Sequence, residues 1–274
     1  LDEFYTKLNV ARDCLSFIKN FVDISTKDII IEPSAGDGSF IKGIKSLCPN
    51  YLFLDVNSER KDILKQDYLT LDVGYIADKY RKCHVIGNPP FGRQSSLAIK
   101  FIKKSCEYCD TISFILPRSF KKESRKKFFP LNFYLKFEQD LPSNSFLINN
   151  QSHDVPCVFQ IWEKTSSKRK EPEKVVPLNF LFVKKNEAPT IAVRRVGANA
   201  GRIDWVTSNK NEHSHYFIKF VNFELSGALY EKLMDIKYKN VADTIGPKSI
   251  SKQELTIEFN AVIGEFIPRK IIYA

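Results

Sequence analysis

The feature that most constrains the fold is an alternation of short apolar runs with segments of helical spacing between residues 28 and 117. The run DIIIE at 28–32 leads into a small-residue turn and then into IKGIKSL, whose apolar positions recur with a helical period. Strand-like runs return at 51–56, 83–91 and 111–117, and a helical stripe lies at 96–109. Strands that alternate with helices predict a doubly wound parallel sheet, which is an α/β fold.

The rest of the chain extends this pattern on both sides. A helix is expected at 8–22, and a last apolar strand at 155–164 closes a first domain over residues 1–165. The charged, Pro-containing segment 166–177 then indicates a linker. We expect a small mixed lobe over 166–274, with strands near 180–185, 190–197 and 215–223 and a helix near 224–236.

Charge and cysteine content indicate the kind of partner and the compartment to expect. The 274 residues include 42 Lys and Arg against 32 Asp and Glu, a net charge of +10, which favours a polyanionic partner. Six scattered cysteines lack the density of a disulfide framework, which favours a reducing compartment. No long apolar segment or signal-like N-terminus is present, so we expect an intracellular protein, cytoplasmic or nuclear, with no membrane contact.

The small-residue turn at 32–38 (EPSAGDG) is the first candidate site. Small residues let the backbone approach a ligand, and the helix N-terminus beyond them offers unpaired N–H groups. Glu32 ends one strand and Asp55 ends the next. Carboxylates at the C-terminal ends of neighbouring parallel strands lie over the crevice where nucleotides bind, and the second can accept hydrogen bonds from ribose hydroxyls. A tight turn without a ligand is the alternative.

The second candidate site is GNPPF at 87–91, which also follows a strand. Two consecutive prolines fix the backbone and remove its N–H donors, so carbonyl groups there can face a substrate. Asn88 offers a side-chain acceptor and Phe91 an aromatic face. Polar acceptors beside an aromatic ring suit a planar heterocycle with an exocyclic amine, although a plain turn would have the same composition.

Taken together, these motifs resemble those of the SAM-dependent amino-methyltransferases, and of the N6-adenine DNA methyltransferases of the gamma arrangement in particular. In that family a cofactor motif precedes the Gly-rich motif, the Asn/Asp-Pro-Pro-Phe/Tyr motif follows, and target recognition lies at the C-terminal end. Here the order is EFYTK at 3–7, EPSAGDG, NPPF and a basic C-terminal lobe. The resemblance covers about residues 2–164. It implies a Rossmann-like methyltransferase sheet, with catalysis in 1–165 and target recognition in 166–274.

The resemblance also implies a site for S-adenosyl-L-methionine (SAM) and no metal. The first motif would touch the methionine end, EPSAGDG would line the amino-acid and ribose side, and QDYL at 66–69 would frame the adenine, with Phe40 or Val56 packed against it. The cofactor-binding residues implied in this way are Tyr5, Thr6, Glu32, Ser34, Ala35, Gly36, Asp37, Gly38, Asp55, Asp67 and Tyr68.

By the same resemblance the catalytic residues are Asn88, Pro89, Pro90 and Phe91. The Asn88 side chain and the Pro89 carbonyl would accept hydrogen bonds from the target amine and aim its lone pair at the methyl group. Phe91 would stack on the extruded base. This chemistry needs placement and electrostatics more than a strong base.

Four further residues are candidate substrate contacts. Phe146 would close the other face of the extruded base, with an ordinary core position as the alternative. Arg118 opens a segment with six basic residues and one acidic residue, where phosphate contact and plain solvation are both open. Arg194 and Arg195 precede a glycine-containing turn that could follow a nucleic-acid backbone or form an ordinary hairpin.

Several alternatives stay open. An RNA adenine methyltransferase is close to the leading hypothesis, whereas guanine-N2 enzymes commonly continue the motif with His where Gly92 stands here. Protein glutamine methyltransferases use the same turn, and an inactive nucleic-acid-binding partner subunit is a further class. The short segment after the core leaves room for a protein partner that supplies specificity. Cys106 and Cys109 have zinc-ligand spacing, but no second pair follows, so packing is favoured over metal binding.

Overall fold

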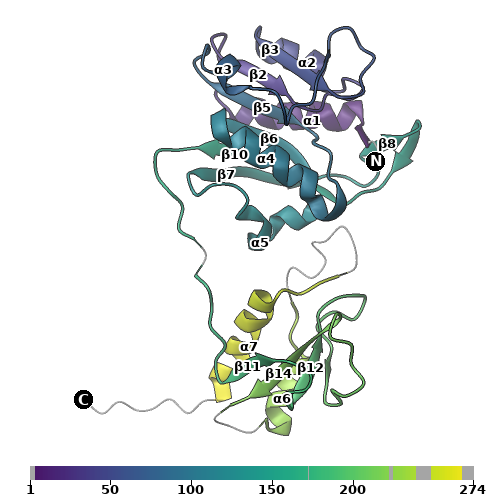
Figure 1. Ribbon diagram of the computed structural model, residues 1–274, viewed down its shortest axis with the longest axis vertical. Coiled ribbons are helices and arrows are strands. Elements are labelled where there is room, and N and C mark those ends of the chain that lie inside the picture. Colours follow the sequence, from purple (N-terminus) through teal and green to yellow (C-terminus); the bar gives the residue numbers. More distant parts are fainter. Residues whose placement is uncertain (1–3, 172, 222–224, 239–247, 267–274) are drawn as a thin grey trace. The chain divides into compact units, whose positions relative to one another are not determined.

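The computed structural model describes residues 4–171, 173–221, 225–238 and 248–266. The chain divides into two compact units, Leu1–Glu171 and Pro172–Ala274 (Figure 1). The first unit extends past the expected boundary at 165, because the Thr165 amide donates to the Asn132 carbonyl and the Arg169 guanidinium to the Phe129 carbonyl, at 2.8 Å each. Glu3, the first residue of the EFYTK motif, lies outside the described residues.

A seven-stranded sheet in the order β4-β3-β2-β5-β6-β10-β7 forms the centre of the first unit. Its strands are β2 (Ile29–Glu32), β3 (Tyr51–Asp55), β4 (Leu64–Lys65), β5 (Cys83–Gly87), β6 (Thr111–Pro117), β7 (Phe133–Asp140) and β10 (Cys157–Lys164). The first five run parallel, and β10 runs antiparallel to both β6 and β7. The sheet is therefore mixed and not all parallel, because β10 returns between two strands of the opposite direction.

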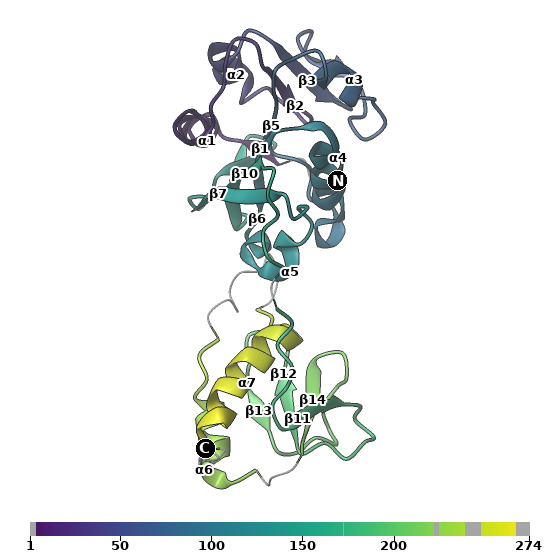
Figure 2. The ribbon, with the colours of Figure 1, turned by 90° about the vertical axis from the view of Figure 1, so that its left-hand side faces the viewer.

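Helices cover both faces of this sheet (Figure 2). Helices α1 (Leu8–Phe21) and α2 (Ile41–Leu47) pack on one face, and α3 (Gly74–Ala77) and α4 (Ser96–Tyr108) on the other. Within β2, Ile30 joins the core under α1 and α2, while Ile29 and Ile31 join the core under α3 and α4. Burial on both faces explains why the sequence shows continuous apolar runs instead of alternation.

The strand order reverses between β2 and β5, since the chain proceeds from β2 outward to β3 and β4 and then returns to β5 on the other side. Ligands of open α/β sheets bind at such a point, outside the carboxyl ends of the strands. Glu32 ends β2, Asp55 ends β3 and Asn88 follows β5. The fold thus brings both candidate motifs to one edge of the sheet.

A small three-stranded sheet lies beside this edge. The hairpin of β8 (Phe146–Ile148) and β9 (Gln151–His153) pairs through β8 with β1 (Tyr5–Thr6). Neither the hairpin nor β7 was expected from the sequence, where the segment between β6 and β10 showed mainly basic residues. Short helical turns η1 (Arg93–Ser95), η2 (Arg118–Lys121) and α5 (Glu123–Lys126) complete the unit.

The described residues of the second unit form a four-stranded antiparallel sheet and two helices, which pack on it through one apolar cluster. The strand order is β11 (Phe180–Val183), β14 (His215–Phe220), β12 (Ile191–Arg194) and β13 (Ile203–Asp204), and the helices are α6 (Gly227–Met234) and α7 (Lys252–Phe266). The predicted fold class, a doubly wound Rossmann-like α/β sheet followed by a small mixed lobe, is confirmed. Within the described ranges, no helix combines the length and hydropathy that crossing a bilayer requires.

Candidate active site

The Gly-rich turn after β2 wraps tightly around the end of β3. The Ala35 amide donates to the Leu54 carbonyl and the Gly36 amide to Asp55 Oδ2, both at 2.8 Å. Gly36 has φ +53°, and a Cβ added there would lie 3.1 Å from the ring of Tyr5. The turn therefore requires a residue without a side chain, because the backbone is left-handed and an aromatic ring lies against it.

Asp55 fixes this turn through both carboxylate oxygens. Oδ2 accepts from the Gly36 amide and Oδ1 from the Asn57 amide, each at 2.8 Å. Each carboxylate oxygen has a second lone pair, so Asp55 retains acceptor capacity toward a ligand. The side chain thus combines the holding of the turn with the capacity to bind hydroxyl groups.

Glu32 is the most deeply buried charged group at this edge, with 1% of its surface exposed. Its Oε2 has no hydrogen-bond partner among the described residues. Burial, followed by the negative charges of Asp37 and Asp55, raises the pKa of Glu32 well above its usual value. A buried acceptor without a donor at the carboxyl edge of such a sheet is a place where a cationic or hydrogen-bonding group would fit.

Asn88 joins three segments of the site. Its Nδ2 donates to the Phe4 carbonyl at 3.0 Å, and its backbone carbonyl accepts from the Ser34 hydroxyl, also at 3.0 Å. Its Oδ1 is buried and has no partner among the described residues. Since Nδ2 is already engaged, the free amide oxygen is oriented as an acceptor for a ligand.

Aromatic rings flank the NPPF turn, in which Pro89 is buried and Pro90 exposed. The half-buried Phe91 stacks on Phe4 with 6.3 Å between ring centroids and 23° between planes. The sequence did not single out Phe4, although it immediately precedes the Tyr5 and Thr6 of the first motif. Pairing of β1 with β8 brings that motif to the site, and the Ser39 hydroxyl donates to the Thr6 carbonyl at 2.6 Å.

Phe146 lies at the site but is not exposed to it. The ring is fully buried and meets Phe4 edge-on at 6.1 Å. In this structure no face of Phe146 is open to a base, so the core alternative describes its position better. The exposed aromatic ring on the same hairpin is His153, whose ring centroid lies 6.0 Å from that of Phe4.

Tyr68 also lies in the core, although a place beside the adenine was expected. It is 1% exposed, its ring stacks on Phe101, and its hydroxyl bonds to Ser105 and Tyr108 of α4. Asp67 is exposed and caps its own turn by accepting from the Leu69 amide. Two further residues, Phe40 and Val56, were expected to pack against the cofactor adenine. Phe40 is buried in the core, and Val56 is 52% exposed.

The basic candidates are distributed over the two units. Arg118 follows β6 and faces Asp140 at 3.7 Å, and Lys121 meets the same carboxylate at 3.2 Å. In the second unit, Arg194 Nε donates to the Val196 carbonyl, whereas Arg195 lies over the ring of Tyr216. Residues 194–202 close a hairpin between β12 and β13. The structure does not place Arg194 and Arg195 relative to the first unit.

All six cysteines are free and buried. Burial raises the pKa of Cys106 to about 12 and raises that of Cys109 well above its usual value, so both remain neutral thiols at physiological pH. Both belong to the core cluster under α4. Among the described residues, no group of three or more His, Cys, Asp or Glu side chains is arranged to hold a metal ion.

Comparison with known proteins finds similarity only in structure. No protein-family model and no curated protein matches the chain. A modification subunit of a putative type I restriction enzyme from Vibrio vulnificus is similar at TM-score 0.47 and 14% identity, over 93% of this chain and 61% of that one. A putative RNA methyltransferase from Pyrococcus horikoshii is similar at TM-score 0.46 and 19% identity, over 60% of this chain and 87% of that one.

A putative methyltransferase from Streptococcus mutans, solved in complex with SAH, is similar at TM-score 0.35 and 17% identity, over 57% of this chain and 95% of that one. Similarity at this level concerns the sheet and its helices and is silent on substrate.

Proposed function

We propose that this protein is a SAM-dependent methyltransferase that acts on the N6 amine of adenine in DNA. The observation that carries the proposal is the buried Oδ1 of Asn88, an acceptor with no partner among the described residues, held in place because Nδ2 donates to the Phe4 carbonyl. A fixed acceptor beside the stacked rings of Phe4 and Phe91 suits a flat base with an exocyclic amine.

The residues at the neighbouring turn fit SAM. The left-handed Gly36 lets the backbone approach a ligand, Asp55 retains lone pairs for ribose hydroxyls, and the partnerless Oε2 of Glu32 would accept from the ammonium group of the methionine portion. Ser34, Ala35, Asp37 and Gly38 would line the same side, and Tyr5 and Thr6 the methionine end. SAM supplies, when bound, an electrophilic methyl group on a positively charged sulfur.

The side chains around Asn88 would orient the amine and stabilise its developing charge. Asn88 Oδ1 and the Pro89 carbonyl would each accept a hydrogen bond from one N–H group of the target amine. These two bonds would turn the lone pair of the amine nitrogen toward the methyl group. As the amine takes up the methyl group, positive charge would grow on its nitrogen, and both acceptors would bind the charged amine more strongly than the neutral one. The surplus proton then leaves to solvent. Phe91 and Phe4 hold the base in position.

The choice of DNA rests on the chain's net charge of +10, which suits a polyanion, and on the order of its motifs. Adenine in RNA presents the same amine, so the experiment below distinguishes DNA from RNA as the substrate. We also propose that the second unit takes part in target recognition, since Arg194 and Arg195 lie there.

The test is transfer from labelled SAM to duplex DNA, single-stranded DNA, structured RNA and protein, followed by mass spectrometry of the digested nucleosides. N6-methyldeoxyadenosine is the expected product, and the Asn88→Ala variant should lose about 100-fold or more in rate. Asn9→Ala, at an exposed position of α1, is the matched control and should retain the rate.

Three results would contradict the proposal. N6-methyladenosine formed in RNA alone would move the substrate to RNA, and label found only in protein would move it to an amide side chain. Tight SAM binding without transfer to any acceptor would indicate a binding subunit.

A further inference from the structure

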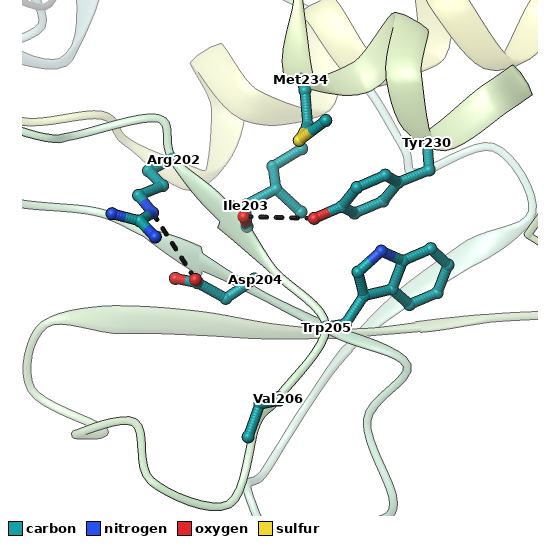
Figure 3. A pocket seen from close by; sticks show the side chains of 7 residues that line it. All are labelled: Arg202, Ile203, Asp204, Trp205, Val206, Tyr230 and Met234. Carbon is teal, nitrogen blue, oxygen red and sulfur yellow. Dashed lines mark hydrogen bonds and ion pairs between the residues drawn. The ribbon is translucent and has the colours of Figure 1, made fainter. Parts of the chain in front are cut away.

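The second unit carries an exposed pair of stacked aromatic rings. Trp205 follows β13 and packs on Tyr230 of α6, with 4.3 Å between ring centroids and 27° between planes (Figure 3). Trp205 keeps 47% of its surface exposed. Because Tyr230 covers one face of the indole, this exposure leaves the other face open to a ligand. Tryptophan has a large apolar surface, so an exposed one at the rim of a pocket is a candidate binding residue.

A hydrogen bond to the buried sheet positions the Tyr230 ring of this pair. The Tyr230 hydroxyl donates to the Ile203 carbonyl at 3.4 Å, and Ile203 itself is buried in the core of the unit. Burial, followed by the charge of Asp204, raises the pKa of Tyr230, which keeps this hydroxyl a neutral donor. Because Tyr230 is already fixed and Trp205 packs on it, the pair loses little side-chain entropy when a ligand stacks on Trp205.

Trp205 and Tyr230 line a pocket of about 550 Å³ together with Arg202, Val206 and Met234 (Figure 3). Val206 and Met234, which are 58% and 50% exposed, add apolar surface to the lining of this pocket. Arg202 and Asp204 line the same pocket and add a guanidinium and a carboxylate to it. The pocket therefore places a flat apolar surface beside charged groups, of which Arg202 is the cation.

Arg202 also lines two further pockets, of about 360 and 460 Å³. Arg194 and Lys210 line the first of these and Lys248 the second. Among the described residues, the charged side chains that line the three pockets are thus four cations and one carboxylate, Asp204. Asp204 meets Arg202 at 3.5 Å and Lys210 at 3.1 Å. The Arg202 side chain is 65% exposed and shares this carboxylate with Lys210, so a phosphate group can compete for Arg202.

The combination selects among possible ligands. A cationic ligand would suit an aromatic pair alone, but the surplus of positive charge repels it. A base in an intact duplex has both faces covered by its neighbours, so it offers no face to Trp205. An unpaired base with its phosphate offers a flat ring to the indole and a negative charge to the arginine.

We propose that the Trp205–Tyr230 pair is a stacking site for an unpaired DNA base, whose flanking phosphate is bound by Arg202. This inference rests on the proposed function in taking DNA as the ligand and places a single-strand contact in the second unit. Arg194 and Lys210 extend the cationic surface along which the neighbouring phosphates would lie.

Tryptophan fluorescence tests the site directly, because the chain has two tryptophans and the other, Trp162, is 1% exposed in the core of the first unit. The full-length protein is titrated with an unstructured single-stranded oligodeoxynucleotide, with the matching duplex and with the RNA of the same sequence. We expect quenching by the single-stranded DNA, weaker binding at higher salt, and little quenching by the duplex.

Binding of the same oligodeoxynucleotide by the variants is followed by fluorescence anisotropy of a dye on the DNA. Trp205→Ala should raise its Kd roughly tenfold, within the range of one lost stacking contact, whereas Trp205→Phe should retain most of the affinity. Arg202→Gln should weaken binding and reduce its salt dependence. Tyr75→Ala removes another exposed aromatic ring, in the first unit, and should leave the Kd unchanged.

An unchanged Kd in Trp205→Ala, stronger quenching by the duplex, or tighter binding of the RNA would each overturn the inference. Methyl transfer is measured in parallel. DNA methylation together with an unchanged Kd in Trp205→Ala would refute this site alone. Binding through Trp205 without DNA methylation would refute the proposed function and leave the stacking site standing.

Discussion

Ser34 and Asn88 are 54 residues apart in the sequence, and the hydroxyl of the first donates a 3.0 Å hydrogen bond to the backbone carbonyl of the second. This bond connects the Gly-rich turn after β2 to the NPPF turn after β5. The group proposed to hold the cofactor and the group proposed to hold the target amine thus share one contact, so a change in either turn should be felt in the other.

Replacing Ser34 by Ala should therefore lower the methylation rate while the protein stays folded. Loss of one partly buried hydrogen bond costs about 1 kcal/mol, and the freed Asn88 carbonyl lets the acceptor side chain drift. Steady-state kinetics should show a larger fall in kcat than rise in KM for SAM. Ser46→Ala, at an exposed hydroxyl within α2, is the control, and equal kinetics in the two variants would refute the coupling.

Gly36→Ala should weaken SAM binding roughly tenfold, because the left-handed backbone disfavours a Cβ by about 1–2 kcal/mol and the new methyl group would press on Tyr5. Isothermal titration calorimetry measures the affinity. Gly227→Ala is the matched control, since a Cβ there meets no atom within 4 Å and the residue lies at the start of α6. Identical SAM affinity in the two variants would show that the turn tolerates a side chain.

Glu32 should make the stability of the ligand-free protein depend on pH. Burial raises its pKa in the folded state above the ordinary 4.5, so the stability it contributes is complete below that value and is lost as pH rises through the raised pKa. Glu32→Gln stays neutral throughout. Urea unfolding between about pH 5 and pH 8 should show that the free energy of unfolding of the variant rises relative to that of the wild type as pH rises. A difference between the two free energies that stays constant with pH would contradict the assignment.

The opposite edge of the sheet should govern acid unfolding. Asp28 is fully buried and accepts from Arg81 Nε at 2.7 Å, from the Ser25 amide at 2.7 Å and from His84 at 3.3 Å. Burial alone would raise the pKa of Asp28, but the bonds from Arg81, Ser25 and His84 outweigh it and hold the pKa below its usual value. The contribution of Asp28 to the free energy of unfolding is present above its ordinary pKa of 3.8. This contribution is lost as pH falls through the lowered pKa of the folded state.

Asp28→Asn should lower the free energy of unfolding at neutral pH by about 2 kcal/mol, because the buried hydrogen-bond network loses its charge. The variant should also lose less stability on acidification than the wild type. Asp62→Asn, in an exposed pair with Arg60, should change little by either measure. Chemical unfolding of all three proteins at two pH values checks both expectations.

The parallel strands and the two loop motifs were readable from the sequence because their signals are local. Burial on both faces makes β2, β5 and β6 continuously apolar, and the turn residues that follow them are few in type. The edge strand β7 was missed although its apolar residues alternate with polar ones, because it is only partly buried and lacks the continuous apolar run of the central strands. The direction of β10 also escaped prediction, since a buried strand has the same composition in either direction.

The two turns of the site were predictable from the sequence, but the side chains packed around them were not. Tyr68 and Phe146 carry the residue types expected at a ligand, yet both are buried because their rings pack on α4 and on Phe4 respectively. Phe4 and His153 meet only through the pairing of β1 with the β8–β9 hairpin. Contacts of that range leave no periodic trace in a single sequence.

The docking of β1 bears on the order in which the protein folds. Asn88 meets Phe4 across 84 residues, and the Lys7 ammonium meets the Ser152 hydroxyl across 145. Loops of this length close late, after the local helices and the central strands have formed. Catalytic competence should therefore appear last during refolding, which makes enzymatic activity a reporter of complete folding that far-UV circular dichroism, sensitive to the earlier helices, would not provide.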